Sequence, residues 1–298
     1  MTIPESQLDT WSKQGSVAQS RDTYATVKNT LDNSGSPYYL KSFESFLQGS
    51  YGNDTNVYGR DSDVDVVLRL DSTWYHNAAL LPYDQYQAFK RGYPGTADYG
   101  LSAFKTQVAT WLKDRFNGVT VGSKAIFIPG NGTRRDCDVL VCARFKYYYR
   151  FNSVGDESYA EGICFFLNDG TQIVNFPKRH SDNCTAKHKA TSQWFKPTVR
   201  IYKNMRNYLV DSNMLKDGIA PSYFIEGMLW NVPAGNFGKS YDETFVATFN
   251  YLLNADRVTF KCANDIHPLL QANSHVSWSP ANCQAYLDAL RNLWNNWR

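Results

Sequence analysis

The sequence predicts an α+β protein in which a mixed sheet with helices precedes a helical lobe. Strand-like alternation and turn signals dominate up to about residue 176, and apolar residues at helical spacing dominate from about residue 185. The 298 residues, 43% of them hydrophobic, suffice for two cores. We therefore predict a core domain with an N-terminal helix over 1–180, a helical lobe over 181–298, and a ligand cleft between them.

The first elements alternate between helices and strands. Residues 5–32 predict one long helix with a polar face. Segment 40–51 ends as a strand, and 64–70 is a clear strand that alternates before it enters an apolar run. Residues 82–97, rich in Tyr, Gly and Pro, predict a loop, and the apolar stripe of 101–112 predicts a helix.

Strands then return. Residues 119–128 predict one strand, and 137–145 predict another. Segments 163–167 and 172–176 flank Asn168-Asp169-Gly170, and an Asp-Gly pair between apolar runs is typical of a hairpin.

The second part reads as a series of helices. Pro197 fits the first turn of a helix that reaches Val210, and Pro221-Ser222 open another. Ser240 to Glu243 predict a capping box before an apolar run, and Ser279-Pro280 open the last helix.

Overall charge and composition exclude several classes of protein. The net charge is +3 with a pI near 8.4, and Lys/Arg runs are lacking, so we do not expect a long nucleic acid as partner. The N-terminus lacks a secretory pattern and no apolar run reaches the length of a membrane span. The six cysteines form no CxxC pair. We expect reduced thiols in a cytoplasmic monomer without membrane contact.

Histidine and cysteine recur at His180, Cys184 and His188, a spacing that in principle can hold a metal. The surrounding HSDNC segment looks like a loop and a fourth ligand is not obvious. We do not expect zinc here.

Two acids stand at the mouth of an apolar run in FLQGSYGNDTNVYGRDSDVDVVLRL. Asp63 and Asp65 are two residues apart on a strand and therefore share a face. Like charges this close repel, whereas carboxylate oxygens are ligands that Mg²⁺ prefers. The alternative is a solvated strand end.

Nearby features strengthen the metal interpretation. Gly49-Ser50 lie upstream, where glycine permits close approach of a phosphate and serine adds a hydroxyl donor. A later strand brings a further acid in Arg135-Asp136-Cys137-Asp138-Val139. Three acids beside a Gly-Ser turn match the needs of a two-metal phosphoryl or nucleotidyl transfer.

The blocks LQGSYGNDTN, DSDVDVVL, CDVLV, IVNFPKRH, RIYKNMRN and PSYFIE, in this order, carry a resemblance to a known family. Gly-Ser followed by the two acids resembles polymerase-β-like nucleotidyltransferases. The full set resembles the bacterial cyclic-oligonucleotide synthases of anti-phage defence, relatives of animal cyclic GMP–AMP synthase, and within them the pyrimidine-accepting clade. The resemblance extends from about residue 40 to 230 and, more weakly, through the remaining residues.

The resemblance implies roles for the acids and the Gly-Ser turn. Gly49 and Ser50 would bind donor phosphates, and Asp63 and Asp65 would hold Mg²⁺, with Mn²⁺ as the alternative. Asp138 would complete the site and help to deprotonate the acceptor hydroxyl. Asp136 competes for that role; we prefer Asp138 because it directly precedes the apolar run.

The same resemblance assigns four further residues. Lys203 would reach the triphosphate, although the basic stripe of Lys196, Arg200 and Lys203 is otherwise typical of a solvated face. Ser222 would bind the terminal phosphates, and the Tyr223 ring would stack on the donor base. Asn175 would read the pyrimidine edge, although an Asn before Phe-Pro is also an ordinary turn residue.

The implied activity is cyclisation of two NTPs, with UTP and ATP expected, into a 3′,3′-linked cyclic dinucleotide. The product would contain uridine, as cyclic UMP–AMP or cyclic di-UMP, and would signal to a separate effector. Two alternatives remain open: transfer of NMP to RNA, a protein or a small molecule, and a nucleotide sensor without catalysis.

Overall fold

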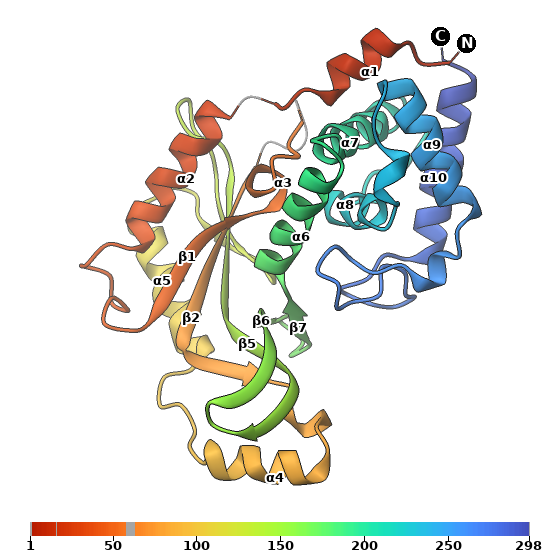
Figure 1. The fold of residues 1–298 in the computed structure, drawn as a ribbon. Coiled ribbons are helices and arrows are strands. Elements are labelled where there is room, and N and C mark those ends of the chain that lie inside the picture. Colours follow the sequence, from red (N-terminus) through yellow and green to blue (C-terminus); the bar gives the residue numbers. More distant parts are fainter. Residues whose placement is uncertain (1, 16, 58–62, 298) are drawn as a thin grey trace. The chain divides into compact units, whose positions relative to one another are not determined.

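A seven-stranded mixed sheet organises one of the two units of the molecule (Figure 1). The computed structural model describes residues 2–15, 17–57 and 63–297. The sheet unit comprises Gln19–Leu47 and Asp63–Pro177, and the helical unit comprises Met1–Ala18, Gln48–Ser62 and Lys178–Arg298. The mixed sheet with helices and the helical part agree with the predicted α+β class. The domain boundary at residue 180 stays a prediction, while both units are discontinuous in the sequence.

The sheet has the order β1-β2-β5-β4-β3, and β6 pairs with both β5 and β7. Strands β2 and β5 are parallel, whereas the β3–β4, β4–β5, β5–β6 and β6–β7 pairs are antiparallel. The strands are β1 (Phe43–Gln48), β2 (Val64–His76), β3 (Thr120–Val121), β4 (Ile126–Ile128), β5 (Cys137–Ser153), β6 (Asp156–Phe166) and β7 (Gln172–Asn175).

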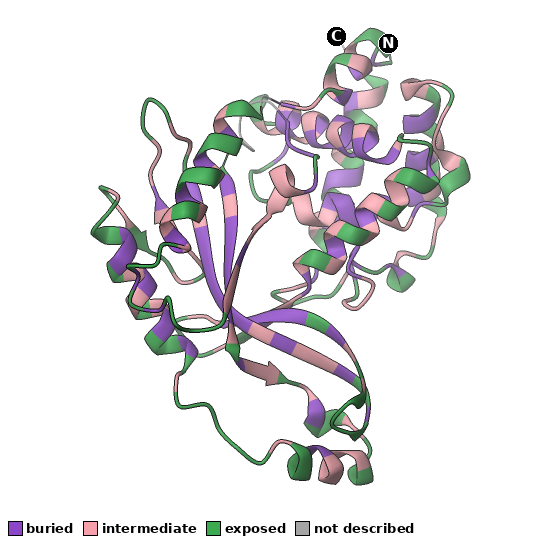
Figure 2. Ribbon diagram, turned by 60° about the vertical axis from the view of Figure 1, so that its left-hand side comes forward, coloured by how far each residue is buried: buried purple, intermediate pink, exposed green. Residues whose placement is uncertain are grey.

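Two helices, α2 (Ala18–Leu31) and α5 (Leu101–Lys113), cover one face of this sheet (Figure 1). Alternate β2 residues such as Val64 and Val66 pack into the core with Val27 of α2 and Phe104 of α5. Figure 2 shows that buried residues follow the long strands of the sheet. The strands thus present their other set of alternate residues, which includes Asp65, on the opposite face.

The predicted loop over 82–97 is wrong over α4 (Tyr83–Gly92), which is a helix. Aromatic packing overrides the turn signals here, because Phe89 is buried against Tyr148 and Phe151 of β5. Tyr148 and Phe151 of this cluster belong to β5, which extends well beyond the predicted strand end at residue 145. A short 3₁₀ turn, Ala78–Leu80, precedes α4.

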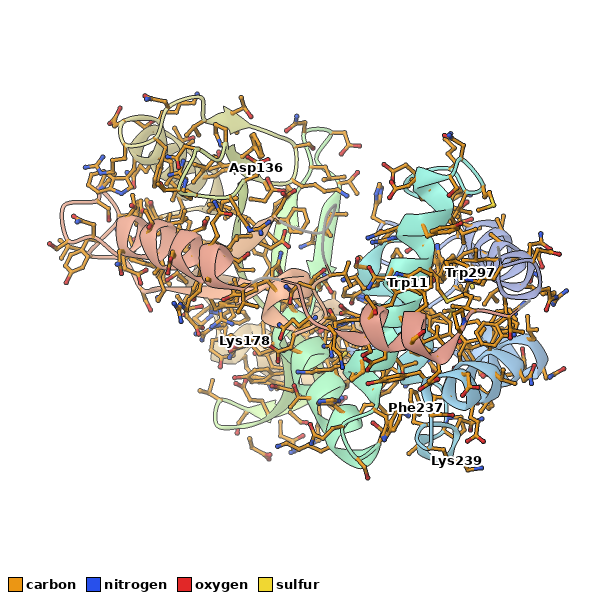
Figure 3. The ribbon with its side chains drawn as sticks, turned by 90° about the horizontal axis from the view of Figure 1, so that it is seen from above. Trp11, Asp136, Lys178, Phe237, Lys239 and Trp297 are labelled. Carbon is orange, nitrogen blue, oxygen red and sulfur yellow. The ribbon has the colours of Figure 1, made fainter. Side chains whose placement is uncertain are left out.

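The helical unit is built around α7 (Phe195–Asp211), whose buried residues line its core. The other elements are α1 (Glu5–Ser12), α3 (Gly49–Gly52), α6 (Pro177–Ala190), α8 (Ser222–Trp230), α9 (Tyr241–Asn254), α10 (Pro280–Asn295) and the 3₁₀ turns Ala234–Asn236 and Arg257–Thr259. Trp11 of α1 meets Trp297 edge to face, with ring centroids 5.4 Å apart (Figure 3).

Three local predictions in and near this unit are wrong. The single helix over 5–32 is two helices, α1 and α2: α1 ends at Ser12, Lys13 is extended, and the Gly15 N–H donates to the carbonyl oxygen of Asn56. The HSDNC segment lies within α6 and is not a loop. The capping box of α9 does not form: Glu5 accepts from the N–H groups of Tyr241 and Asp242, each at 2.8 Å.

In the described part of the chain, we find no helix with the length and apolar character needed to cross a membrane.

Candidate functional site

Two of the predicted metal-binding acids are direct neighbours in the sheet unit. Asp65 of β2 and Asp138 of β5 are register partners on parallel strands, and adjacent strands lie about 4.8 Å apart. Both side chains are partly exposed, while the flanking Val64 and Val139 are buried. The alternation therefore directs both carboxylates to the face away from α2 and α5.

The two remaining acids differ in their surroundings. Asp63 is exposed and directly precedes β2. Asp136 lies before β5, and its Oδ1 accepts a hydrogen bond from the Gly130 N–H at 2.6 Å. The Asp136 side chain thus binds the backbone of the preceding loop, whereas Asp138 lies within the strand beside Asp65. This placement favours Asp138 as the third acid.

The acids concentrate negative charge. Burial raises the pKa of Asp138, and the charge of Asp136 adds to the effect. Burial also raises the pKa of the neighbouring Cys137 thiol to about 12, with the charges of Asp65, Asp138 and Asp63 contributing. A bound divalent cation would relieve this repulsion, and an all-carboxylate donor set suits Mg²⁺.

The Gly-Ser turn belongs to the helical unit. Gly49 begins α3 with a φ of 73°, a left-handed conformation that glycine adopts without strain. Ser50 Oγ accepts from Lys203 Nζ at 2.8 Å, and the same Nζ donates to the carbonyl oxygen of Thr55 at 2.9 Å. The structure therefore brings together Ser50 and Lys203, two predicted phosphate ligands separated by 153 residues.

The other members of the predicted basic stripe do not join Lys203 at Ser50. Lys196 pairs with the Asp54 carboxylate at 2.9 Å. Arg200 donates to the backbone carbonyls of Asp54 and Ser12. Both side chains therefore bind Asp54 of the helical unit, and Arg200 also binds the N-terminal segment at Ser12.

Ser222 and Tyr223 begin α8, as the Pro-Ser signal predicts. Ser222 Oγ accepts from Arg206 at 3.1 Å. The Tyr223 ring stacks on His180, with centroids 4.4 Å apart and planes at 21°, and its hydroxyl accepts from Asn264 Nδ2 at 3.0 Å. Tyr223 is thus held at both its ring and its hydroxyl.

Sequence reasoning missed Glu226. Its side chain is 2% exposed and its carboxylate accepts hydrogen bonds from Thr55 and Asn53 and pairs with His180. The signal was present, because a lone acid within the apolar helix SYFIEGMLW must find partners when buried.

His180, Cys184 and His188, at whose spacing we did not expect zinc, do not come together as a set of three. His180, Cys184 and Glu226 place one ligand atom each within 4.8 Å of one another, whereas His188 accepts from the Lys196 N–H at 3.3 Å. Burial raises the pKa of Cys184 well above its usual range, so its neutral thiol is a poor metal ligand. Both Glu226 oxygens already accept hydrogen bonds, and we interpret the group as a hydrogen-bond network.

Asn175 ends β7. Its Oδ1 accepts from the N–H of Phe176 at 2.8 Å, as in a local turn. Gly162 of β6 lies against this corner: a Cβ there would be 2.7 Å from both the Asn175 carbonyl oxygen and the Phe176 ring. The corner is therefore closely packed around the predicted base-reading residue.

Comparison with known proteins covers the whole chain. Residues 182–295 match the family model of the cGAS/DncV-like nucleotidyltransferase C-terminal helical domain. The chain is 35% identical to the cyclic UMP–AMP synthase of Rhodothermus marinus, over 100% of this chain and 99% of that protein. It is 31% identical to the cyclic dipyrimidine nucleotide synthase CdnE of Legionella pneumophila, over 93% of each.

Solved structures give the same picture. The structure of Rhodothermus marinus CdnE c-UMP-AMP synthase with Apcpp and Upnpp superposes with a TM-score of 0.87 at 34% identity, covering 99% of this chain and 97% of that one. The Elizabethkingia meningoseptica CdnE cyclic dinucleotide synthase with GTP and Apcpp gives a TM-score of 0.74 at 28% identity, covering 98% of each.

Proposed function

Because this chain belongs to the cGAS/DncV-like nucleotidyltransferase family, we propose that it joins two nucleoside triphosphates into a 3′,3′-linked cyclic dinucleotide. The observation that carries the proposal is the pairing of Asp65 with Asp138 in a chain whose relatives over its full length are cyclic nucleotide synthases. Relatives that make cyclic UMP–AMP and cyclic dipyrimidine nucleotides support UTP and ATP as substrates.

In the proposed reaction the 3′-hydroxyl of one nucleotide attacks the α-phosphate of the other, and the bond to the leaving pyrophosphate breaks. Asp63, Asp65 and Asp138 would hold Mg²⁺ or Mn²⁺, which when bound lowers the pKa of the hydroxyl and neutralises the pyrophosphate. Asp138 would help to remove the hydroxyl proton. A second attack within the linear intermediate closes the ring and releases the second pyrophosphate.

The helical unit would supply the groups that bind the donor. Gly49, Ser50, Lys203 and Ser222 would bind its phosphates, and the Tyr223 ring would stack on its base. Asn175 would recognise a pyrimidine. A carboxamide whose oxygen accepts from the Phe176 N–H can donate its own N–H to a pyrimidine carbonyl.

The test is to incubate the purified protein with Mg²⁺ and pairs of labelled NTPs. We expect a phosphatase-resistant product that a 3′–5′-specific nuclease cleaves and whose mass identifies a uridine-containing cyclic dinucleotide. Label transferred to RNA, protein or a small molecule would contradict the proposal, as would the absence of any product. We further propose that the product acts in the cytoplasm on a separate effector of anti-phage defence.

A further inference from the structure

Glu226, outside the predicted catalytic set, lies at the centre of a buried network in the helical unit. Its Oε1 accepts from the Thr55 hydroxyl. Its Oε2 accepts from Asn53 Nδ2 at 2.9 Å and lies 2.7 Å from His180 Nε2. Burial alone would raise the pKa of Glu226, but the hydrogen bond from His180 and the charges of His180 and Lys203 lower it overall. The buried carboxylate is therefore ionised at neutral pH.

One branch of the network leads to the phosphate-binding groups. Thr55 donates to Glu226 through its side chain and accepts from Lys203 Nζ through its backbone oxygen at 2.9 Å. Lys203 is fully buried and donates at 2.8 Å to Ser50 Oγ. The negative charge of Glu226 thus compensates the buried ammonium of Lys203. Through the Thr55 side chain, Glu226 also holds the Thr55 carbonyl group to which that ammonium donates.

The other branch leads to the base-stacking group. His180 is 2% exposed, and its contact with Glu226 anchors the ring at Nε2. The Tyr223 ring stacks on the His180 ring, with centroids 4.4 Å apart and planes inclined at 21°. The direction of the Tyr223 ring therefore follows from where Glu226 holds His180.

We propose that Glu226 is a positioning residue that sets the phosphate-binding pair Ser50–Lys203 and the base-stacking residue Tyr223 through separate branches. The inference rests on the function proposed above, in which these groups bind the donor nucleotide. Glu226 is itself buried, and its effect passes through Thr55 in one branch and His180 in the other.

The test separates the branches with two probes, magnesium tripolyphosphate, which has no base, and a non-hydrolysable magnesium–UTP analogue. Thr55→Val removes one branch and should weaken both probes by a similar factor, about tenfold. His180→Gln keeps a donor near Nε2 but removes the ring, so it should weaken the UTP analogue about tenfold and leave tripolyphosphate unchanged. Glu226→Gln should weaken both probes, and the UTP analogue by the larger factor. The dissociation constants are measured by calorimetry.

Matched controls exclude a general loss of structure. Glu243→Gln makes the same chemical change at an exposed acid of α9 and should bind both probes like the wild type. Thr55→Ser keeps the hydroxyl and should restore binding. If Glu226→Gln does not fold, as judged by thermal unfolding, Thr55→Val and His180→Gln still decide the matter.

Two results would overturn the inference alone: wild-type affinities in folded Glu226→Gln, or a His180→Gln protein that loses as much affinity for tripolyphosphate as for the UTP analogue. A wild-type protein that binds neither probe would instead overturn the proposed function. The two failures are therefore distinguishable.

Discussion

Asp65 and Asp138 lie directly opposite each other on the parallel strands β2 and β5, although 73 positions separate them in the sequence. Parallel pairing requires a long connection between the two strands, and here that connection includes α4 and α5. The parallel pairing thus brings two like charges side by side. Such a costly arrangement is typical of a functional site.

Asp138→Asn is expected to lower the rate of product formation at least about a hundredfold, because a metal-binding carboxylate is lost. The same change is expected to stabilise the metal-free protein at pH 7. The pKa of Asp138 is raised by burial and by Asp136. Its stabilising contribution is therefore present below the usual carboxyl pKa of about 3.9 and is lost as pH rises through the folded-state pKa. Thermal unfolding between pH 3.5 and 7 without Mg²⁺ checks this.

Added Mg²⁺ should raise the unfolding temperature of the wild type more than that of Asp138→Asn. Asp136→Asn serves as the comparison, since the Asp136 side chain holds Gly130. A variant at Asp136 that loses activity while Asp138→Asn retains it would reverse the assignment of the third acid.

Lys203→Met is expected to weaken binding of a magnesium–NTP analogue at least about tenfold, because it removes the ammonium that donates to Ser50 Oγ. Calorimetric titration measures the effect. Lys216→Met, at an exposed position, is the matched control and should bind normally. Unchanged affinity in a folded Lys203→Met protein would contradict a phosphate-binding role.

Gly162→Ala is expected to displace β7, since the added Cβ would lie 2.7 Å from the Asn175 carbonyl oxygen and the Phe176 ring. We expect a loss of about 1–3 kcal/mol in the free energy of unfolding and a lower ratio of UTP to ATP incorporation. Denaturation and product analysis by mass measure the two effects. Gly95→Ala, where a Cβ would meet nothing within 4 Å, is the control; an unaltered base ratio would argue against Asn175 as the base reader.

Glu5→Ala is expected to lower the free energy of unfolding by about 1 kcal/mol without changing turnover, because Glu5 caps the first N–H groups of α9. Chemical denaturation followed by circular dichroism measures the loss. Asp9→Ala removes an exposed partner of Lys13 on the same helix and should cost less than about 0.5 kcal/mol. Equal losses in both variants would show that the cap contributes nothing.

Local signals were sufficient for much of this fold. The apolar stripe that predicted the helix over 101–112 is the buried side of α5, and Asn168-Asp169-Gly170 joins the antiparallel strands β6 and β7. Helix α8 begins at Ser222, as Pro221 indicated. These elements carry their own turn residues or periodicity, so neighbours in space did not have to be known.

Elements that depend on partners distant in the sequence could not be predicted from local signals. Helix α4 is held by Phe89 against β5 residues, and the cap of α9 comes from Glu5. The same distinction applies to the residues of the candidate site. Its acids could be predicted from a local sequence pattern. The role of Glu226 could not, because its hydrogen-bond partners Thr55 and His180 lie far away in the sequence.

The division of the chain into interleaved segments also governs the order in which the protein can fold during synthesis. The sheet unit lies within residues 19–177 and has all its strands once residue 177 has left the ribosome. The helical unit needs Leu8 near the start and Leu290 near the end in one core. Because Glu5 binds Tyr241 and Leu8 shares a core with Leu290, the N-terminal segment completes its contacts only after residue 290 has been translated.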